Sequence, residues 1–423
     1  MKQRKEERKI MMEKELSGIL EKHGQEHIFA AYQKLDEEGK KKLSEQVERI
    51  DWSVVEMSCK KLEGHEVLKQ ERGKLEPLSA LEVSEIEKNK EKYSKIGIDA
   101  IKAGKVGAVL LAGGQGTRLG SDGPKGKYNI GITKDVFIFE RLIRNLLDVT
   151  DKAGCFVPLY VMTSDKNHDE TTSFFAEKNY FGYPKDYVKF FKQEMAPSVD
   201  FNGKLYMESQ DSLSLSPNGN GGWFYSMAVT GVLEDVKKRG IEWLNIFAVD
   251  NVLQRIADPV FVGATLESGC VSGAKVVRKA DPHEKVGVLC LEDGKPSIVE
   301  YYEMTDEIIN SRRPNGDLSY NFGVILNYLF RVDKLEQIMN EKMPVHVVEK
   351  KIPYMTADGE YVRPETPNGY KFELLVLDMI HLLDNCLSFE VVRDYEFAPI
   401  KNKTGVDSVE SARALLKKNG VEL

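Results

Sequence analysis

The stretch AVLLAGGQGTRLGSDGPKGKYNIG, residues 108–131, decides the fold class. An apolar run ends in a cluster of glycines, and two cationic side chains, Arg118 and Lys125, follow within a dozen residues. A short apolar run bounded by glycine is typical of a buried strand. Glycine lets backbone N–H groups approach a ligand closely, and successive N–H groups form a concavity that binds anions. We therefore predict a strand followed by an anion-binding loop.

The pattern beyond this stretch indicates an α/β fold. From about residue 99, short apolar strands alternate with amphipathic helices, which is typical of a sheet with helices on both faces. We predict a doubly wound, mixed but mainly parallel, Rossmann-like sheet. Ligands bind such sheets beyond the carboxyl ends of the strands, so the loops after Ala112, Ser164, Gln193 and Asp250 should share one rim. The expected strands cover 107–112, 157–164, 188–193, 244–250 and 274–279, and the expected helices 136–154, 169–182 and 225–240.

The domain organisation follows from where this alternation begins. Before it, apolar residues are spaced by three and four, as on the inward face of helices. We predict a helical N-terminal domain over residues 1–98. A second, α/β domain should cover 99–395, and a short C-terminal segment should cover 396–423.

Composition limits the possible partners. The chain has 423 residues and a formal net charge of −7, which argues against binding to nucleic acid. The longest apolar runs are about half of the ~20 residues that a membrane helix needs. The five cysteines are scattered and show no C-x-x-C spacing, which favours a reducing compartment. We expect a soluble, cytoplasmic protein that binds neither membranes nor nucleic acid; the sequence leaves the oligomeric state open.

The glycine loop departs from two common phosphate-binding motifs. A P-loop requires serine or threonine after its lysine, but glycine follows Lys125. The spacing of Gly114, Gly116 and Gly120 is one residue too long for a dinucleotide fingerprint, which disfavours a dinucleotide-dependent oxidoreductase. Arg118 and Lys125 instead suit a nucleoside triphosphate, because they would stabilise the charge that develops on a departing pyrophosphate.

The string LLAGGQGTRLG followed by PKG resembles the signature of the UTP-dependent sugar-1-phosphate uridylyltransferases. The resemblance is greatest to the eukaryotic-type UDP-N-acetylhexosamine pyrophosphorylases. It extends from HGQEHIFAAYQKLDEE (23–38) to EFAPIKN (396–402). It implies an enzyme that converts UTP and a sugar 1-phosphate, expected to be N-acetylglucosamine 1-phosphate, into a UDP-sugar and pyrophosphate with Mg²⁺ as cofactor. It also implies that residues 99–395 form a nucleotidyltransferase catalytic domain with a β insertion for the sugar. Eukaryotic members continue with a further domain, so we expect a shortened version here.

The resemblance assigns nucleotide contacts to the first glycine loop and to two later segments, FFKQEMAPS (190–198) and SPNGNGGWFYSM (216–227). The amide of Gln193 should read the uracil ring, because an amide donates and accepts hydrogen bonds at once. The GNGG pattern matches the hexosamine branch of the family. The expected nucleotide-binding residues are Leu111, Ala112, Gly113, Gly114, Gly116, Thr117, Gln193, Gly221 and Gly222.

The resemblance also implies the residues that carry the chemistry. Arg118 and Lys125 should contact the leaving pyrophosphate, and Lys401, in EFAPIKNKTG, the α-phosphate. Asp250 ends the expected strand LNIFAVD and matches the family's metal ligand. Mg²⁺ prefers one or two carboxylates together with phosphate oxygens. From the residues alone, Asp250 could equally cap the start of a helix.

The expected sugar-binding residues depart in part from the family pattern. Two family phenylalanines are leucines in KFELLVLD (371–378), which predicts a wider pocket, and the family pattern FNAGN stands as YNFGV. A UTP–glucose-1-phosphate uridylyltransferase or a broad UDP-sugar pyrophosphorylase is therefore an alternative, although the GNGG pattern opposes it. A non-catalytic nucleotide-binding protein is a more distant one. The expected sugar-binding residues are Asn220, Gly287, Glu300, Asn321, Leu375 and Leu377.

Overall fold

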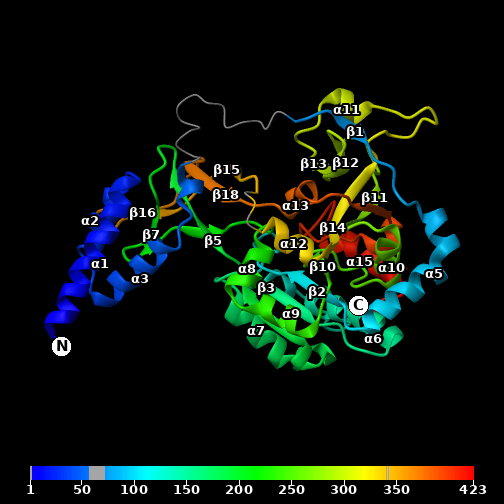
Figure 1. Cartoon of the computed structure of the whole chain (residues 1–423), viewed down its shortest axis with the longest axis horizontal. Coiled ribbons are helices and arrows are strands. Elements are labelled where there is room, and N and C mark those ends of the chain that lie inside the picture. Colours follow the sequence, from blue (N-terminus) through cyan, green and yellow to red (C-terminus); the bar gives the residue numbers. More distant parts are fainter. Residues whose placement is uncertain (1, 57–71, 340, 342) are drawn as a thin grey trace. The chain divides into compact units, whose positions relative to one another are not determined.

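The computed structural model describes residues 2–56, 72–339, 341 and 343–423. The chain divides into two compact units (Figure 1). The first unit combines the residues up to 71 with 194–220 and 344–375. The second unit combines 72–193, 221–343 and 376–423. Each unit is therefore built from segments that are far apart in the sequence.

The second unit contains a ten-stranded mixed sheet whose parallel half carries the glycine loop. β10 (Trp243–Ala248), β2 (Val106–Leu111), β3 (Leu159–Thr163) and β4 (Val188–Lys192) are neighbours in this order and run parallel. Every residue of β2 and β3 is buried, which explains their continuous apolar runs. These four strands confirm the expected ones, and their carboxyl ends share one edge.

The other half of the same sheet is largely antiparallel. β14 (Phe322–Arg331) pairs antiparallel with β10, with β11 (Ser272–Arg278) and with β12 (Val288–Glu292). The remaining strands extend this half through β12 and β11; they are β1 (Leu75–Pro77), β13 (Lys295–Val299) and β19 (Leu387–Glu390). The expected mixed α/β fold is thus confirmed.

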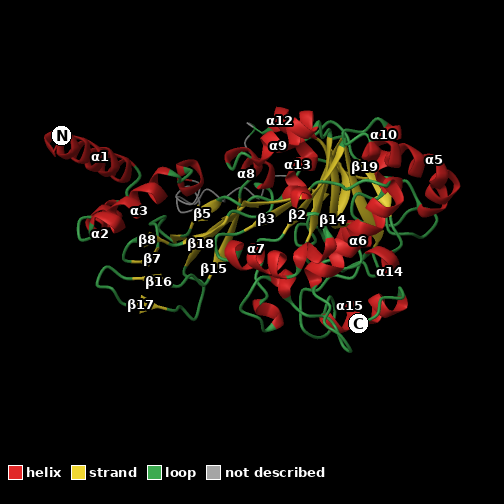
Figure 2. Cartoon of the chain, turned by 90° about the horizontal axis from the view of Figure 1, so that it is seen from below, coloured by secondary structure: helices red, strands yellow, loops and turns green. Residues whose placement is uncertain are grey.

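Helices lie on both faces of this sheet (Figure 2). The apolar side of α6 (Ile138–Ala153) is buried, because its apolar residues recur at helical spacing. The helix expected over 225–240 is two helices, since Gly231 adopts a left-handed φ of 76° between them. The helices of the second unit are α5 (Val83–Lys102), α6, α7 (His168–Glu177), α8 (Trp223–Val229), α9 (Val232–Arg239), α10 (Pro259–Ser268), α11 (Asp306–Asn310), α12 (Val332–Ile338), α13 (Val376–Leu382), α14 (Arg393–Glu396) and α15 (Val409–Lys418).

The first unit packs N-terminal helices against strands from later in the chain. The buried side chains of Leu20, Ile28, Leu43 and Val47 share one apolar core with Phe372. The helices are α1 (Lys2–Lys22), α2 (Glu26–Tyr32) and α3 (Glu37–Glu48). The strands are β5 (Met195–Pro197), β6 (Val199–Asp200), β7 (Met207–Ser209), β8 (Ser212–Leu213), β9 (Leu215–Pro217), β15 (His346–Lys350), β16 (Tyr354–Met355), β17 (Tyr361–Val362) and β18 (Gly369–Glu373).

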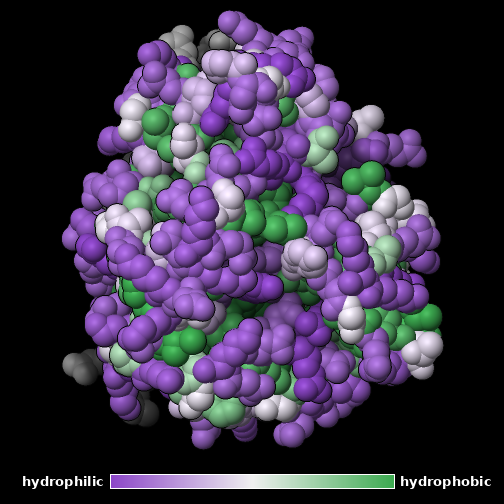
Figure 3. Space-filling model, turned by 90° about the vertical axis from the view of Figure 1, so that its right-hand side faces the viewer, coloured by the Kyte–Doolittle hydropathy of each residue, from purple (hydrophilic) through white to green (hydrophobic). Residues whose placement is uncertain are grey.

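The two units differ from the expected division at residue 98. β1 and α5 belong to the second unit, and the first unit contains strands as well as helices. The three N-terminal helices share one apolar core with residues of 194–220 and 344–375, so packing on these later segments helps to bury their apolar side chains. One face of the molecule is covered mostly by hydrophilic residues, with small apolar groups between them (Figure 3). Among the described residues, no helix is both long and apolar enough to cross a bilayer.

Candidate active site

The loop after β2 folds back on itself and returns its second cation to the glycines. The backbone N–H of Lys125 donates to the carbonyl of Gly114 at 3.1 Å, and that of Gly116 donates to the carbonyl of Gly123 at 2.9 Å. Arg118 lies on a short 3₁₀ helix, Thr117–Leu119, and is exposed to solvent. An added Cβ on Gly114 would meet nothing within 4 Å. The loop therefore presents open backbone with cations on both sides of its turn.

Gln193 lies directly against the first glycine of this loop. A Cβ built on Gly113 would lie 2.0 Å from Oε1 of Gln193, so position 113 has no room for a side chain. Gln193 follows β4, is buried, and its backbone N–H donates to the carbonyl of Thr163 at 2.8 Å. Leu111 and Ala112 are buried beside it at the end of β2. The structure thus brings together the glycine loop and the amide that was expected to read uracil.

Two further polar residues support this corner and were missed in the sequence. The side-chain amide of Asn167 donates to the carbonyls of Ala112 at 2.9 Å and Gly114 at 3.3 Å, while its oxygen accepts from the N–H of Ser164. The hydroxyl of Ser164 is buried beside Gly113 and has no hydrogen-bond partner among the described residues. Asn167 immediately precedes α7, so in the sequence it looks like an ordinary helix cap.

Three cations and one carboxylate gather near the carboxyl ends of β2 and β10. Nζ of Lys125 lies 3.9 Å from Oδ2 of Asp250. Burial lowers the pKa of Lys125, the carboxylate of Asp250 raises it, and the positive charges of Arg118 and Lys401 lower it. The predicted catalytic and metal-binding residues therefore come together from three distant segments. Their positive charge exceeds what Asp250 alone can compensate.

The backbone holds the C-terminal segment to the end of β10. The carbonyl of Asp250 accepts a hydrogen bond from the N–H of Ile400 at 2.9 Å. The buried side chain of Asn251 accepts from the N–H of Ala398 at 2.9 Å and donates to the carbonyl of Glu396 at 2.8 Å. From the sequence, we considered a helix cap at this strand end only for Asp250. In the structure Asn251 fixes the segment that leads to the C-terminal lysine.

Lys401 has a carboxylate partner that the sequence analysis did not single out. Its Nζ lies 3.1 Å from Oδ2 of Asp407, and its backbone N–H donates to the carbonyl of the same residue at 2.7 Å. The α-phosphate expected at Lys401 would therefore compete with Asp407 for the ammonium group.

Behind this segment, a fully buried lysine ties three elements together. Nζ of Lys275, on β11, donates to Oε2 of Glu396 at 2.6 Å and to Oδ2 of Asp258 at 3.0 Å. Burial raises the pKa of Glu396 more than the lysine lowers it. Burial also raises the pKa of Asp258, but Lys275 and Arg255 hold it below its ordinary value. This charge network makes Lys275 a structural residue.

Three of the expected sugar residues meet in the antiparallel half of the sheet. Gly287 and Glu300 flank the β12–β13 pair, and a Cβ on Gly287 would lie 3.6 Å from Cδ of Glu300. Asn321, just before β14, is buried and accepts through Oδ1 from the N–H of Lys279 at 3.1 Å. The pairing of Val288 with Gly323 joins β12 to β14 at this point.

The remaining expected contacts are divided between the units. Gly221 and Gly222 are buried in the second unit, where Gly222 precedes α8. Leu377 is buried on α13 of the same unit. Asn220 and Leu375 belong to the first unit. The sugar-binding set expected from the sequence is therefore carried by both units.

A family model described as UTP–glucose-1-phosphate uridylyltransferase matches residues 53–423, most of the chain. The chain belongs to this uridylyltransferase family. The expected resemblance and the expected class of enzyme, a nucleotidyltransferase, are thereby confirmed.

Several relatives of the chain are named as UDP-N-acetylglucosamine or UDP-N-acetylhexosamine pyrophosphorylases. The chain is 39% identical to the UDP-N-acetylglucosamine pyrophosphorylase of Saccharomyces cerevisiae over 79% of its length and 72% of the relative's. It is 35% identical to a mouse UDP-N-acetylhexosamine pyrophosphorylase-like protein over 93% of its length and 82% of the relative's. Among solved structures, the Trypanosoma brucei uridine diphosphate N-acetylglucosamine pyrophosphorylase superposes with a TM-score of 0.80 at 27% identity, covering 96% and 84% of the two chains.

Proposed function

We propose that this chain transfers the uridylyl group of UTP to a hexose 1-phosphate, forming a UDP-sugar and pyrophosphate. N-acetylglucosamine 1-phosphate is the proposed acceptor, in line with the relatives' printed activities. The observation that carries the proposal is the half-buried Lys125, 3.9 Å from Asp250 and surrounded by the charges of Arg118 and Lys401. In this reading, the parallel half of the sheet acts as a doubly wound nucleotide-binding sheet in a cytoplasmic enzyme.

The proposed chemistry is an in-line displacement at the α-phosphorus of UTP. An oxygen of the sugar phosphate attacks the phosphorus, and the bond to the pyrophosphate oxygen breaks. The attacking phosphate is already anionic, so no general base is needed, and the protein contributes positioning and charge stabilisation. Lys125 and Arg118 donate to the departing pyrophosphate, where negative charge develops. Lys401 leaves Asp407 and contacts the α-phosphate.

The residues present fit a Mg²⁺ ion held partly by substrate. Among the described residues, no group of three or more histidine, cysteine, aspartate or glutamate side chains is arranged to hold a metal. Asp250 supplies one carboxylate at the rim. Mg²⁺ commonly binds one or two carboxylates and takes phosphate oxygens and water for its other positions. Bound there, the ion would neutralise phosphate charge during transfer.

We assign recognition of the base to the glycine loop with Gln193, and recognition of the sugar mainly to the region around β12, β13 and β14. Gln193 reads uracil while the backbone from Leu111 to Thr117, with Gly221 and Gly222, holds the nucleotide. Glu300 and Asn321 supply donors and acceptors for sugar hydroxyls near Gly287. Asn220, Leu375 and Leu377 complete the proposed sugar contacts. Glucose 1-phosphate is a second candidate acceptor, because leucine at 375 and 377 is smaller than the family's phenylalanine.

A pyrophosphate-release assay tests the proposal. The purified chain is incubated with UTP, Mg²⁺ and, separately, N-acetylglucosamine, N-acetylgalactosamine and glucose 1-phosphates. We expect release that needs both substrates and is fastest with N-acetylglucosamine 1-phosphate. Faster release with glucose 1-phosphate would support the second candidate. No release with any of the three acceptors would overturn the proposed function.

A further inference from the structure

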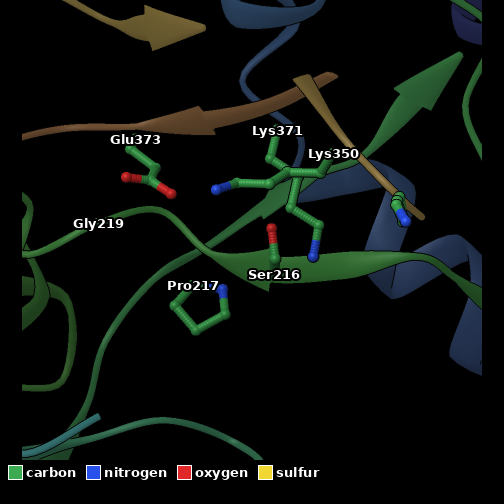
Figure 4. Close-up of a pocket in the computed structure, with 7 residues that line it drawn as sticks. Ser216, Pro217, Gly219, Lys350, Lys371 and Glu373 are labelled. Carbon is green, nitrogen blue, oxygen red and sulfur yellow. The ribbon is translucent and has the colours of Figure 1, made fainter. Parts of the chain in front are cut away.

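The first unit contains a cavity of about 420 Å³ lined by three lysines. It lies over one face of the β15–β18 pair. Its lining residues are Ser216, Pro217, Gly219, Lys350, Lys351, Lys371 and Glu373 (Figure 4). All of them belong to the first unit, whereas Arg118, Lys125, Asp250 and Lys401 belong to the second. The volume is in the range typical of small-molecule sites.

Strand pairing places two of the three lysines, Lys350 and Lys371, on one face. Lys350 pairs with Gly369, and Val348 pairs with Lys371. Side chains alternate between the two faces of a strand, so Lys350, Lys371 and Glu373 share one face. The opposite face carries Phe372, which is buried in the core of the unit. Packing of one face of the strand pair in the core fixes its position. The opposite face carries the side chains of Lys350 and Lys371.

The charge of the lining does not balance. Three lysines and one carboxylate, that of Glu373, line the cavity. The chain as a whole has a net charge of −7, whereas the lining of this cavity is positively charged. A local excess of positive charge attracts an anion. Lysine presents a compact charge that suits phosphate oxygens.

A second observation is independent of the lysines. Ser216 is only 7% exposed, and its hydroxyl has no hydrogen-bond partner among the described residues. In Figure 4 this hydroxyl points toward the lysine side chains. A buried hydroxyl without a partner is costly, and a bound acceptor oxygen would satisfy it. A ligand with negatively charged oxygen atoms would therefore suit both the Ser216 hydroxyl and the lysines.

The backbone at one end of the cavity is also fixed. Gly219 has a left-handed φ of 88°, and an added Cβ would lie 2.3 Å from the carbonyl oxygen of Leu374. The N–H of Leu374 donates to the carbonyl of Asn218 at 2.6 Å. The glycine turn is therefore attached to the end of β18, which also carries Lys371 and Glu373. The lining is anchored on both strands and on this turn.

From these observations we infer that this cavity is a second anion site, which binds the phosphate or pyrophosphate group of a small metabolite. The lysines supply charge and the Ser216 hydroxyl donates one hydrogen bond to a phosphate oxygen. The inference goes beyond the proposed reaction, because none of the residues assigned to phosphoryl transfer lines the cavity.

The test separates this site from the reaction site with a Lys125→Met background. Calorimetric titration of that full-length variant with inorganic pyrophosphate should still show one binding event. Adding Lys350→Gln and Lys351→Gln should weaken it at least about tenfold, because charge-assisted hydrogen bonds are lost. Ser216→Ala should weaken it by a smaller factor. The control pair Lys34→Gln and Lys41→Gln, exposed lysines of the same unit outside the cavity, should leave it unchanged.

Two further measurements characterise the ligand. Titrations with inorganic phosphate and with glucose 1-phosphate identify whether a free or an esterified phosphate binds better. Binding should weaken with added salt. No binding to the Lys125→Met variant, or equal binding after the Lys350 and Lys351 changes, overturns the inference. Turnover of the unmodified chain is measured in parallel. An active chain without this site leaves the proposed function standing, and an inactive chain with it overturns only the proposed function.

Discussion

Two lysines of the central sheet region, Lys125 and Lys275, show how the same side chain can serve a ligand or the fold. Lys275 is fully buried and donates to Glu396 at 2.6 Å and to Asp258 at 3.0 Å. The side chain of Lys125 is 15% exposed, and its nearest carboxylate, Asp250, is 3.9 Å away. Two other cations lower its pKa further.

The difference lies in how far the protein itself compensates the charge. The ammonium group of Lys275 already donates hydrogen bonds to two carboxylates and is fully buried, so it is not available to a ligand. Burial and the positive charges of Arg118 and Lys401 disfavour the protonated form of Lys125. An anionic ligand would stabilise that form. Positive charge that is not fully compensated characterises the proposed binding site, whereas Lys275, with two carboxylate partners, has a structural role. The predictions that follow apply similar changes to both.

The largest expected effect is on stability at Lys275. Lys275→Met leaves two carboxylates buried without their cation, so we expect the free energy of unfolding to fall by about 3–5 kcal/mol. Denaturant unfolding measures this. Adding Glu396→Gln and Asp258→Asn should recover part of the loss, because the uncompensated charges are removed. A single variant as stable as the unmodified chain would contradict the structural role.

The matched change at Lys125 should affect turnover instead. Lys125→Met should lower kcat about 10²–10³-fold, because a donor to the leaving group is lost. The pKa of Lys125 is lowered in the fold, so at neutral pH its charge costs stability, and that cost is relieved as pH rises through the lowered pKa. We therefore expect the denaturation midpoint to stay the same or rise. A large loss of stability with normal turnover would reverse the comparison.

A third variant tests the link between the two regions. Asn251→Ala removes the contacts that hold Ala398 and Glu396, leaving a buried N–H and a buried carbonyl unpaired. Each such group costs about 1–3 kcal/mol. We expect lower stability together with a lower kcat, because the segment that leads to Lys401 is held less firmly to the end of β10. Asn251→Asp keeps the acceptor for Ala398 and should retain more activity; equal activity in the two variants would argue against this positioning role.

The smallest expected effect is on the ionisation of Lys125. Arg118→Gln removes one of the charges that lower the pKa of Lys125, so that pKa should rise. A smaller fraction of the amine is then neutral at a given pH, and its acylation should slow by about twofold. Peptide mass spectrometry after brief labelling at pH 8 measures the rate. The rate at exposed Lys34 provides the reference, and an unchanged ratio would show that Arg118 does not act on Lys125.

The sequence could predict the parts of the molecule that depend on local pattern. Continuous apolar runs identified β2, β3, β4 and β10, and their shared edge followed from parallel pairing. The glycine loop, Arg118 and Lys125 stood out because they are contiguous. The family resemblance added Asp250 and Lys401. These two residues are about 150 positions apart in the sequence, and both lie near Lys125 in the structure.

The rest depended on contacts that no local pattern reveals. Asn167 and Asn251 act through hydrogen bonds to backbone far away in the sequence, and before a helix or after a strand they look like caps. The division at residue 98 did not include the two later segments on which the N-terminal helices pack. The partner of Lys401, Asp407, is close in sequence, but its role needs the turn between them.

The contact between Gly113 and Gln193 also constrains how this protein can diverge. A methyl group at position 113 would occupy the space of the glutamine's amide oxygen. The two positions can therefore vary only as a pair: a descendant that acquires alanine in the loop needs a shorter side chain at the end of β4. Such a double replacement takes two mutational steps, and the first is unfavourable if the alanine comes first.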